Sequence, residues 1–217
     1  MKTKFAKLLL FILIVFHQHL LAQTDTSSCF VFEDWKSMVD NKPTKKLFGI
    51  QPIKRSNKEI RLFGGNDFTV ALLNTKVSRA QFEEETYAFY YDDTLYINGE
   101  KLNIQNHFCK VILQGNKIVF IGAASNKQMD YYDELTAFYA ASGRNETSLI
   151  AEMHSKRFLY VLSLEKRKPQ ASLLDQSAMK KLLESNLPLF ESYAAEKKPE
   201  EWATLLRYLG QLTISKC

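Results

Sequence analysis

The spacing of apolar and polar residues divides the chain into three parts. Residues 8–16 form an unbroken apolar run of nine residues. Between residues 46 and 122, runs rich in Val, Ile, Phe and Tyr alternate with polar segments, as in strands joined by turns. From residue 175 onward, apolar residues recur at helical spacing. The pattern predicts an apolar leader, then a sheet, then helices.

The sheet is predicted to be mostly antiparallel, because short strands follow one another with only turns between them. The predicted strands are residues 46–55, 59–63, 68–73, 87–91, 95–98, 108–113 and 117–121. The predicted turns contain Gly, Asn or Asp, and among them are Gly64-Gly65-Asn66-Asp67, Asp92-Asp93-Thr94 and Gln114-Gly115-Asn116. The apolar run at 157–164 predicts a further strand, buried on both sides, with one face formed by Phe158, Tyr160, Leu162 and Leu164.

Helices are predicted early in the chain at residues 30–41 and after the sheet at 130–141. Asp175 is a suitable N-cap for a helix whose apolar face holds Met179, Leu182 and Leu183. Further helical segments are predicted at 189–195 and from Pro199, the last with an apolar face of Trp202, Leu205, Leu206 and Leu209.

A sheet followed by helices indicates an α+β fold, with the C-terminal helices packed on the sheet. We expect a single domain over residues 23–217. It is mainly β with one or two helices over residues 23–165, and it is helical over residues 170–217.

The first 22 residues have the order of a secretory signal peptide. Lys2, Lys4 and Lys7 precede the apolar run, and Ala22 supplies a small residue before Gln23. We therefore expect an exported protein, periplasmic or extracellular. Two alternatives remain open: an uncleaved membrane anchor over residues 5–22, which would bring membrane contact, and lipidation at Cys29.

The net charge of +5 comes largely from this leader. The leader holds three of the 29 basic residues and none of the 24 acidic ones, so the remaining chain carries a formal charge of +2. This balance, and basic clusters without interleaved aromatic residues, argue against a nucleic-acid partner.

Cofactor, metal and catalytic motifs are absent from the sequence. There is no Cys-x-x-Cys, His-Glu-x-x-His or phosphate-binding loop, so neither a metal nor a cofactor is predicted. The two histidines after the leader, His107 and His154, are not in a recognisable catalytic motif. Of the three cysteines, Cys29 and Cys217 are the candidates for a bridge, with three reduced thiols as the alternative.

Several segments in a fixed order resemble a family of uncharacterised secreted bacterial proteins carrying a domain of unknown function. They are Asn41-Lys42-Pro43, Gly64-Gly65-Asn66-Asp67, Leu95-Tyr96-Ile97-Asn98, Arg157-Phe158-Leu159-Tyr160-Val161 and the Leu-rich helices between Met179 and Leu212. The resemblance spans most of the chain after the leader. It implies no activity and assigns no functional residue.

The functional hypothesis is a non-catalytic binding or structural module of the bacterial envelope, with an envelope protein or a glycan as its partner. Its candidate partner surface is Tyr87, Phe89, Tyr91 and Tyr96, because tyrosine rings combine an apolar body with a polar edge. The competing interpretation is that these rings fill the core. The alternative function is an envelope hydrolase whose site the sequence does not reveal.

Overall fold

The computed structural model of the protein describes residues 28–73, 75–142, 146–165 and 167–214. The predicted leader lies outside the described residues, as does Cys217 and with it the candidate bridge to Cys29. Within the described residues, no helix has the length and apolar character to cross a membrane.

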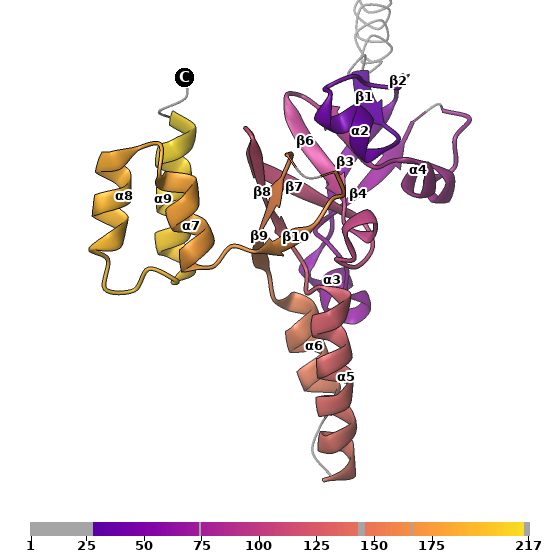
Figure 1. Cartoon of the computed structure of the whole chain (residues 1–217). Helices are drawn as coiled ribbons and strands as arrows, with labels where there is room; N and C mark the ends of the chain where they lie inside the picture. The colour runs from indigo at the N-terminus through magenta and orange to yellow at the C-terminus, as the bar shows by residue number, and fades with distance from the viewer. Residues whose placement is uncertain (1–27, 74, 143–145, 166, 215–217) are drawn as a thin grey trace, which may run out of the picture.

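The described strands join in one antiparallel sheet (Figure 1). Its strands are β1 (Ser28–Phe32), β2 (Lys45–Phe48), β3 (Ile50–Lys54), β4 (Phe68–Leu72), β5 (Ala88–Tyr91), β6 (Thr94–Asn98), β7 (Phe108–Leu113), β8 (Lys117–Gly122), β9 (Phe158–Ser163) and β10 (Ala171–Leu173). The main strand order is β10-β9-β8-β7-β6-β5-β1-β2. The β3–β4 hairpin joins this sheet through β7, where Phe68 is opposite Phe108.

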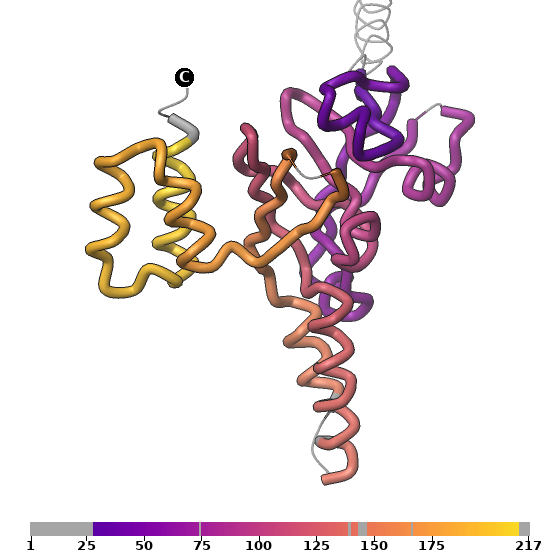
Figure 2. Tube along the Cα trace, viewed as in Figure 1, coloured from indigo at the N-terminus to yellow at the C-terminus, as the bar shows by residue number. Residues whose placement is uncertain are grey.

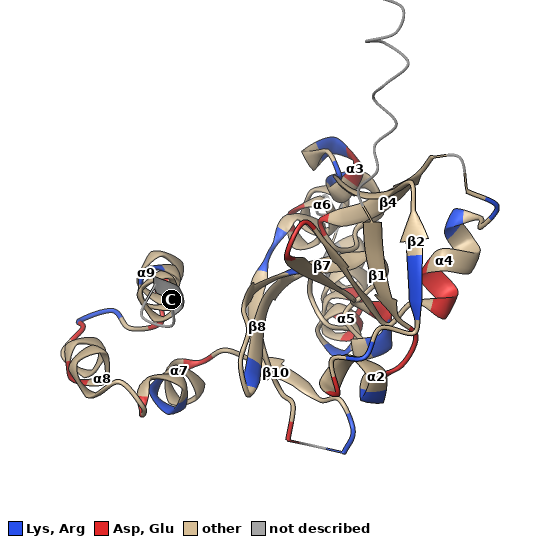
Figure 3. Cartoon of the chain, turned by 90° about the horizontal axis from the view of Figure 1, so that it is seen from above, with Lys and Arg blue, Asp and Glu red and all other residues tan. Residues whose placement is uncertain are grey.

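Helices lie at the ends and on the faces of the sheet. They are α2 (Trp35–Val39), α3 (Asn57–Phe63), α4 (Arg79–Glu85), a 3-10 turn η1 (Glu100–Leu102), α5 (Asn126–Ala141), α6 (Glu146–Ser155), α7 (Gln176–Leu183), α8 (Leu187–Ala194) and α9 (Trp202–Ile214). The α5–α6 hairpin extends away from one end of the sheet (Figure 2). The three C-terminal helices stand together beside β8, as Figure 3 shows from above.

Side chains alternate between the two faces of the sheet, and three apolar clusters result. The first cluster covers one face from β1 and β5 to β9 and includes Phe32, Ile97, Phe120 and Tyr160. On the opposite face, the second cluster packs β7, β8 and β9 against the C-terminal helices. The third packs β1, β5 and β6 against the β3–β4 hairpin and α4. The α+β prediction, with C-terminal helices packed on the sheet, is confirmed.

Strand β9 confirms the prediction of a strand buried on both sides. Tyr160 and Leu162 belong to the first cluster, with Phe158 and Leu164 packed against it, whereas Leu159 belongs to the second. The N-cap prediction at Asp175 is also confirmed, since its side chain accepts a hydrogen bond from the backbone of Ala178 at 2.8 Å.

Several local predictions are wrong. Residues 59–63 form helix α3 rather than a strand, because Ser56 and Glu59 make a reciprocal capping box. Residues 30–32 belong to strand β1, so the early helix is only the short α2. The last helix begins at Trp202 rather than at Pro199. Helices α4 and α6 and strand β10 were not predicted.

Candidate functional site

The four residues predicted to form a partner surface lie mostly inside the protein. Tyr87, Phe89 and Tyr96 are 6%, 0% and 7% exposed, and Tyr91 is half-buried. Phe89 stacks on Tyr96 at 5.1 Å between ring centroids, and the ring of Phe82 on α4 covers it at 5.6 Å. Phe89 and Tyr96 fill the core under the β3–β4 hairpin and α4, whereas Tyr87 packs in the first apolar cluster beside Trp35 of α2. A contact surface here would rest on Tyr91 alone.

The neighbouring Tyr90 points to the other face of β5 and lines a cavity of about 730 Å³. We call this the β1–β5 cavity; its lining residues are Ser28, Phe30, Asn41, Pro43, Tyr90, Asp92, Asp93 and Gln114. Its lining joins the β5–β6 turn, through Asp92 and Asp93, to the β7–β8 turn, through Gln114. Its volume is within the range of small-molecule sites.

Two aromatic rings form the apolar part of the cavity. Phe30 on β1 is directly opposite Tyr90 on β5. Two positions further along β1, Phe32 is fully buried and meets the edge of Tyr90 at 5.7 Å between ring centroids. Phe30 is 40% exposed, so the apolar cover of this face ends between Phe32 and Phe30. The cavity is therefore the open end of the first apolar cluster.

Two carboxylates stand at the rim of the cavity, on the β5–β6 turn. Asp92 and Asp93 are its two central residues and have φ angles of 44° and 57°. A two-residue hairpin turn needs positive φ at both positions, and Asp tolerates this better than most residues. Among the described residues, no side chain or backbone group forms an ion pair or hydrogen bond with either carboxylate, so both are available to a ligand.

A hydrogen bond links the cavity to the β7–β8 turn. The hydroxyl of Tyr90 donates to Oε1 of Gln114 at 2.6 Å. Burial raises the pKa of Tyr90, so its hydroxyl stays protonated and can donate at neutral pH. This bond fixes the aromatic ring against a turn that lies 24 residues away in the sequence.

The histidines do not form a nucleophile–base arrangement. Nδ1 of His107 lies 3.3 Å from Oε1 of Glu83, and the Thr69 hydroxyl donates to the same oxygen at 3.3 Å. Burial acts to raise the pKa of Glu83, but these two contacts outweigh it and lower the pKa. An activated hydroxyl would have to contact the imidazole rather than the carboxylate. Nδ1 of His154 faces the backbone oxygen of Arg61 at 3.2 Å.

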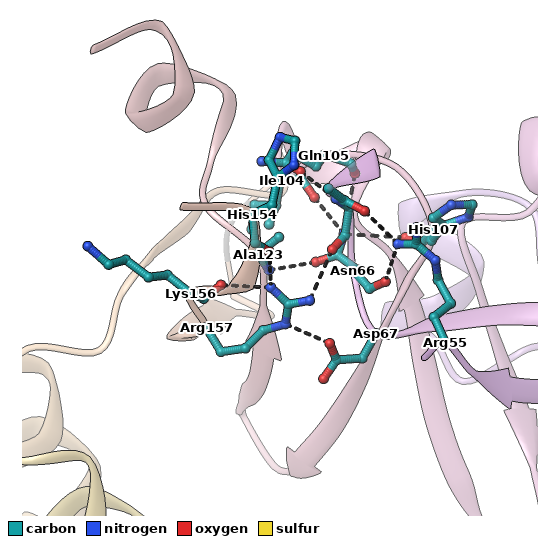
Figure 4. Close-up of polar contacts among 12 residues, drawn as sticks. Arg55, Asn66, Asp67, Ile104, Gln105, His107, Ala123, His154, Lys156 and Arg157 are labelled. Atoms are coloured by element: carbon teal, nitrogen blue, oxygen red, sulfur yellow. Dashed lines mark hydrogen bonds and ion pairs between the residues drawn. The ribbon is translucent and has the colours of Figure 1, made fainter. Parts of the chain in front are cut away.

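The Gly64-Gly65-Asn66-Asp67 segment is a buried structural junction (Figure 4). Nδ2 of Asn66 donates to the backbone oxygens of Ile104 and Asn106 at 2.6 and 2.9 Å. Its Oδ1 accepts from the backbone of Ala123 at 2.7 Å, so one amide joins three segments of the chain. Among the described residues, no cluster of His, Cys, Asp and Glu could hold a metal ion.

Two arginines complete this junction. Nη1 of Arg55 donates to the backbone oxygens of Gly64 and Asn66 at 2.7 and 3.0 Å. Nε of Arg157 donates to Asp67 at 2.6 Å. The arginines bind backbone oxygens and a carboxylate of the chain itself, which indicates a structural role for the motif.

The sequence contained part of the signal for the β1–β5 cavity. Tyr90 stands between Phe89 and Tyr91 in the predicted strand, so its side chain must point to the face opposite theirs. The contribution of Phe30 was missed because residues 30–41 were predicted to be helical. The partnership of β1 with β5 joins residues distant in sequence, and no local pattern encodes it.

The comparisons with known proteins identify a family but no activity. The family model of a family of unknown function (DUF6563) matches residues 30–216, and the chain therefore belongs to this family. No curated protein and no solved structure matches the chain.

Proposed function

We propose that this member of the DUF6563 family is an exported, non-catalytic binding module of the bacterial envelope that holds a glycan in the β1–β5 cavity. The observation that carries the proposal is the pair of opposed rings, Phe30 and Tyr90, beside the two carboxylates of Asp92 and Asp93. Export is supported by the three-part order of the first 22 residues.

A sugar ring matches the chemistry of this lining. Aromatic side chains offer an apolar face to the C–H groups of a sugar, and their polar edges remain available for hydrogen bonds. Carboxylate oxygens accept hydrogen bonds from hydroxyl groups, and charged acceptors make stronger ones. The charge of Asp92 and Asp93 repels acidic sugars, so neutral sugars and amino sugars are the favoured ligands.

Binding is tested with the mature chain, starting at Gln23, against neutral and amino-sugar tetrasaccharides such as cellotetraose and chitotetraose. Calorimetry should give saturable binding to at least one of them. Removing a central aromatic contact by Phe30→Ala should weaken that binding about tenfold or more.

Phe48→Ala is the matched control, because Phe48 is 58% exposed on the adjacent strand β2 and does not line the cavity. Lys46 lies over both rings, with Nζ 5.3 Å from the centroid of Phe30 and 5.5 Å from that of Phe48. Each variant thus removes one phenylalanine ring together with its cation–π contact to Lys46. Equal losses in both would contradict a role for the cavity.

Export has its own test. Mass spectrometry of the protein recovered from the envelope or medium of its source cell should find an N-terminus at Gln23. A chain that retains residues 5–22 would instead support a membrane anchor.

A hydrolase is the second candidate, on the single observation that His107 lies against the carboxylate of Glu83. In that case the wild-type chain should degrade the oligosaccharide it binds, and His107→Gln should abolish the degradation. Intact oligosaccharide recovered after prolonged incubation favours the binding module.

A further inference from the structure

A second cavity, of about 350 Å³, lies where the edge of the sheet meets helix α7. We propose that it binds an anionic group: a phosphate, a sulfate or a carboxylate. Its lining residues are Lys117, Val161, Ser163, Gln170, Ser172, Leu173, Asp175, Ser177, Ala178 and Lys181. The site is independent of the β1–β5 cavity and of the glycan proposal, since the two share no lining residue.

The walls of this cavity are held by packed elements on both sides. On the sheet side, Lys117 of β8 is directly opposite Ser163 of β9. On the helix side, Met179 and Leu183 of α7 are 0% exposed in the second apolar cluster. The backbone N–H of Leu174, between β10 and α7, donates to the backbone oxygen of Leu159 on β9 at 2.8 Å. The cavity is therefore preformed.

Two lysines give the cavity its positive charge. Figure 3 shows basic segments on both β8 and α7. Among the described residues, neither Lys117 nor Lys181 forms an ion pair or hydrogen bond through its ammonium group. Both also line a further cavity of about 250 Å³, whose lining includes Asn116 and Glu184.

The carboxylate in the lining does not cancel this charge. Asp175 is the N-cap of α7, and its Oδ1 already accepts the backbone N–H of Ala178 at 2.8 Å. Two lysines against one aspartate leave a net charge of +1 on the lining of the 350 Å³ cavity. This excess positive charge attracts an anion and repels a cation.

Hydrogen-bond donors stand beside the charges. Three serines, Ser163, Ser172 and Ser177, line the cavity, and each carries a hydroxyl that can donate. The first turn of α7 also faces it, and the start of a helix carries partial positive charge and backbone N–H groups without intrahelical partners. Several donors around two ammonium groups match the several acceptor oxygens of a phosphate, sulfate or carboxylate group.

The test is an NMR titration of the ¹⁵N-labelled mature chain with inorganic phosphate, with sulfate and with acetate, at low ionic strength. The expected result is saturable shifts of the amide signals of Ser163, Ser172 and Ser177. The variant Lys117→Gln/Lys181→Gln should weaken binding about tenfold or more, because two charged donors are lost. Lys180→Gln, on the same helix but outside the cavity, is the control and should bind like the wild type.

A parallel measurement with vesicles containing phosphatidylglycerol separates a lipid headgroup from a free anion. Loss of vesicle binding in the double variant, but not in Lys180→Gln, identifies the headgroup as a source of the anion. The proposal is overturned if no anion produces saturable shifts at these serines. It is also overturned if the double variant and the control respond equally, because the effect is then general surface charge.

Discussion

Phe30 and Tyr90 face each other across strands β1 and β5, although 60 positions separate them in the sequence. The next pair inward, Phe32 and Ala88, is fully buried, whereas Phe30 is 40% exposed. The same face of the sheet thus changes from core to open cavity within two residues. This change leaves both Phe30 and Tyr90 in the lining of the β1–β5 cavity.

The Gly64–Asp67 junction makes the first prediction about stability. Gly65 has a φ of 84°, and a Cβ placed on it would lie 2.3 Å from Oδ1 of Asn106. Gly65→Ala should therefore lower the free energy of unfolding by about 1–3 kcal/mol.

Gly210→Ala is the control, because a Cβ at Gly210 in α9 meets nothing within 4 Å. That change should be neutral or stabilise the protein by up to about 1 kcal/mol. Urea unfolding measures both, and equal effects would contradict the role of the junction.

The C-terminal helices make a second prediction. Leu183 of α7 is 0% exposed in the second apolar cluster, whereas Leu187 of α8 is 63% exposed. Leu183→Ala should cost about 2–5 kcal/mol of unfolding free energy, because it leaves a cavity between the helices and the sheet. Leu187→Ala should cost less than about 0.5 kcal/mol. A small effect of Leu183→Ala would mean that these helices do not pack stably on the sheet.

The sequence predicts most of this architecture where the relevant signal is local. Asp175 marks the start of α7, and the turns at residues 92–94 and 114–116 separate the strands they were predicted to separate. The error at α3 was avoidable, since Ser56 and Glu59 have the spacing of a capping box. Residues 56–58 were instead interpreted as a turn, and Glu59 as the first residue of a strand.

Other features depend on contacts that no local pattern records. Asn103, Gln105 and His107 adopt positive φ although none is a glycine. Their loop wraps around the buried side chain of Asn66, which accounts for this backbone only once the fold is known. The β1–β5 cavity likewise requires the register of two strands distant in sequence.

The contact between Glu83 and His107 predicts a pH dependence of stability. The pKa of Glu83 is lowered from its ordinary value of 4.5 by His107 and Thr69 acting against burial. A carboxyl group with a lowered pKa in the folded state stabilises the protein above its unfolded pKa. That contribution is lost as the pH falls through the lower folded value.

Glu83→Gln should therefore reduce stability at neutral pH and flatten the loss of stability below about pH 4.5. Glu84→Gln, an exposed neighbour on the same helix, should leave the profile unchanged. Thermal unfolding followed across this pH range is the measurement. Identical profiles for wild type and Glu83→Gln would show that the contact contributes nothing to folding.

The central claim, that the β1–β5 cavity holds a glycan, is tested most directly by mapping a bound oligosaccharide with NMR. In a titration of the ¹⁵N-labelled mature chain with chitotetraose and cellotetraose, we expect saturable shifts for at least one sugar. These shifts should be confined to the amides around Phe30, Asn41, Tyr90, Asp92 and Gln114. Shifts centred on Glu83 and His107, or no saturable shifts with either sugar, would contradict the account.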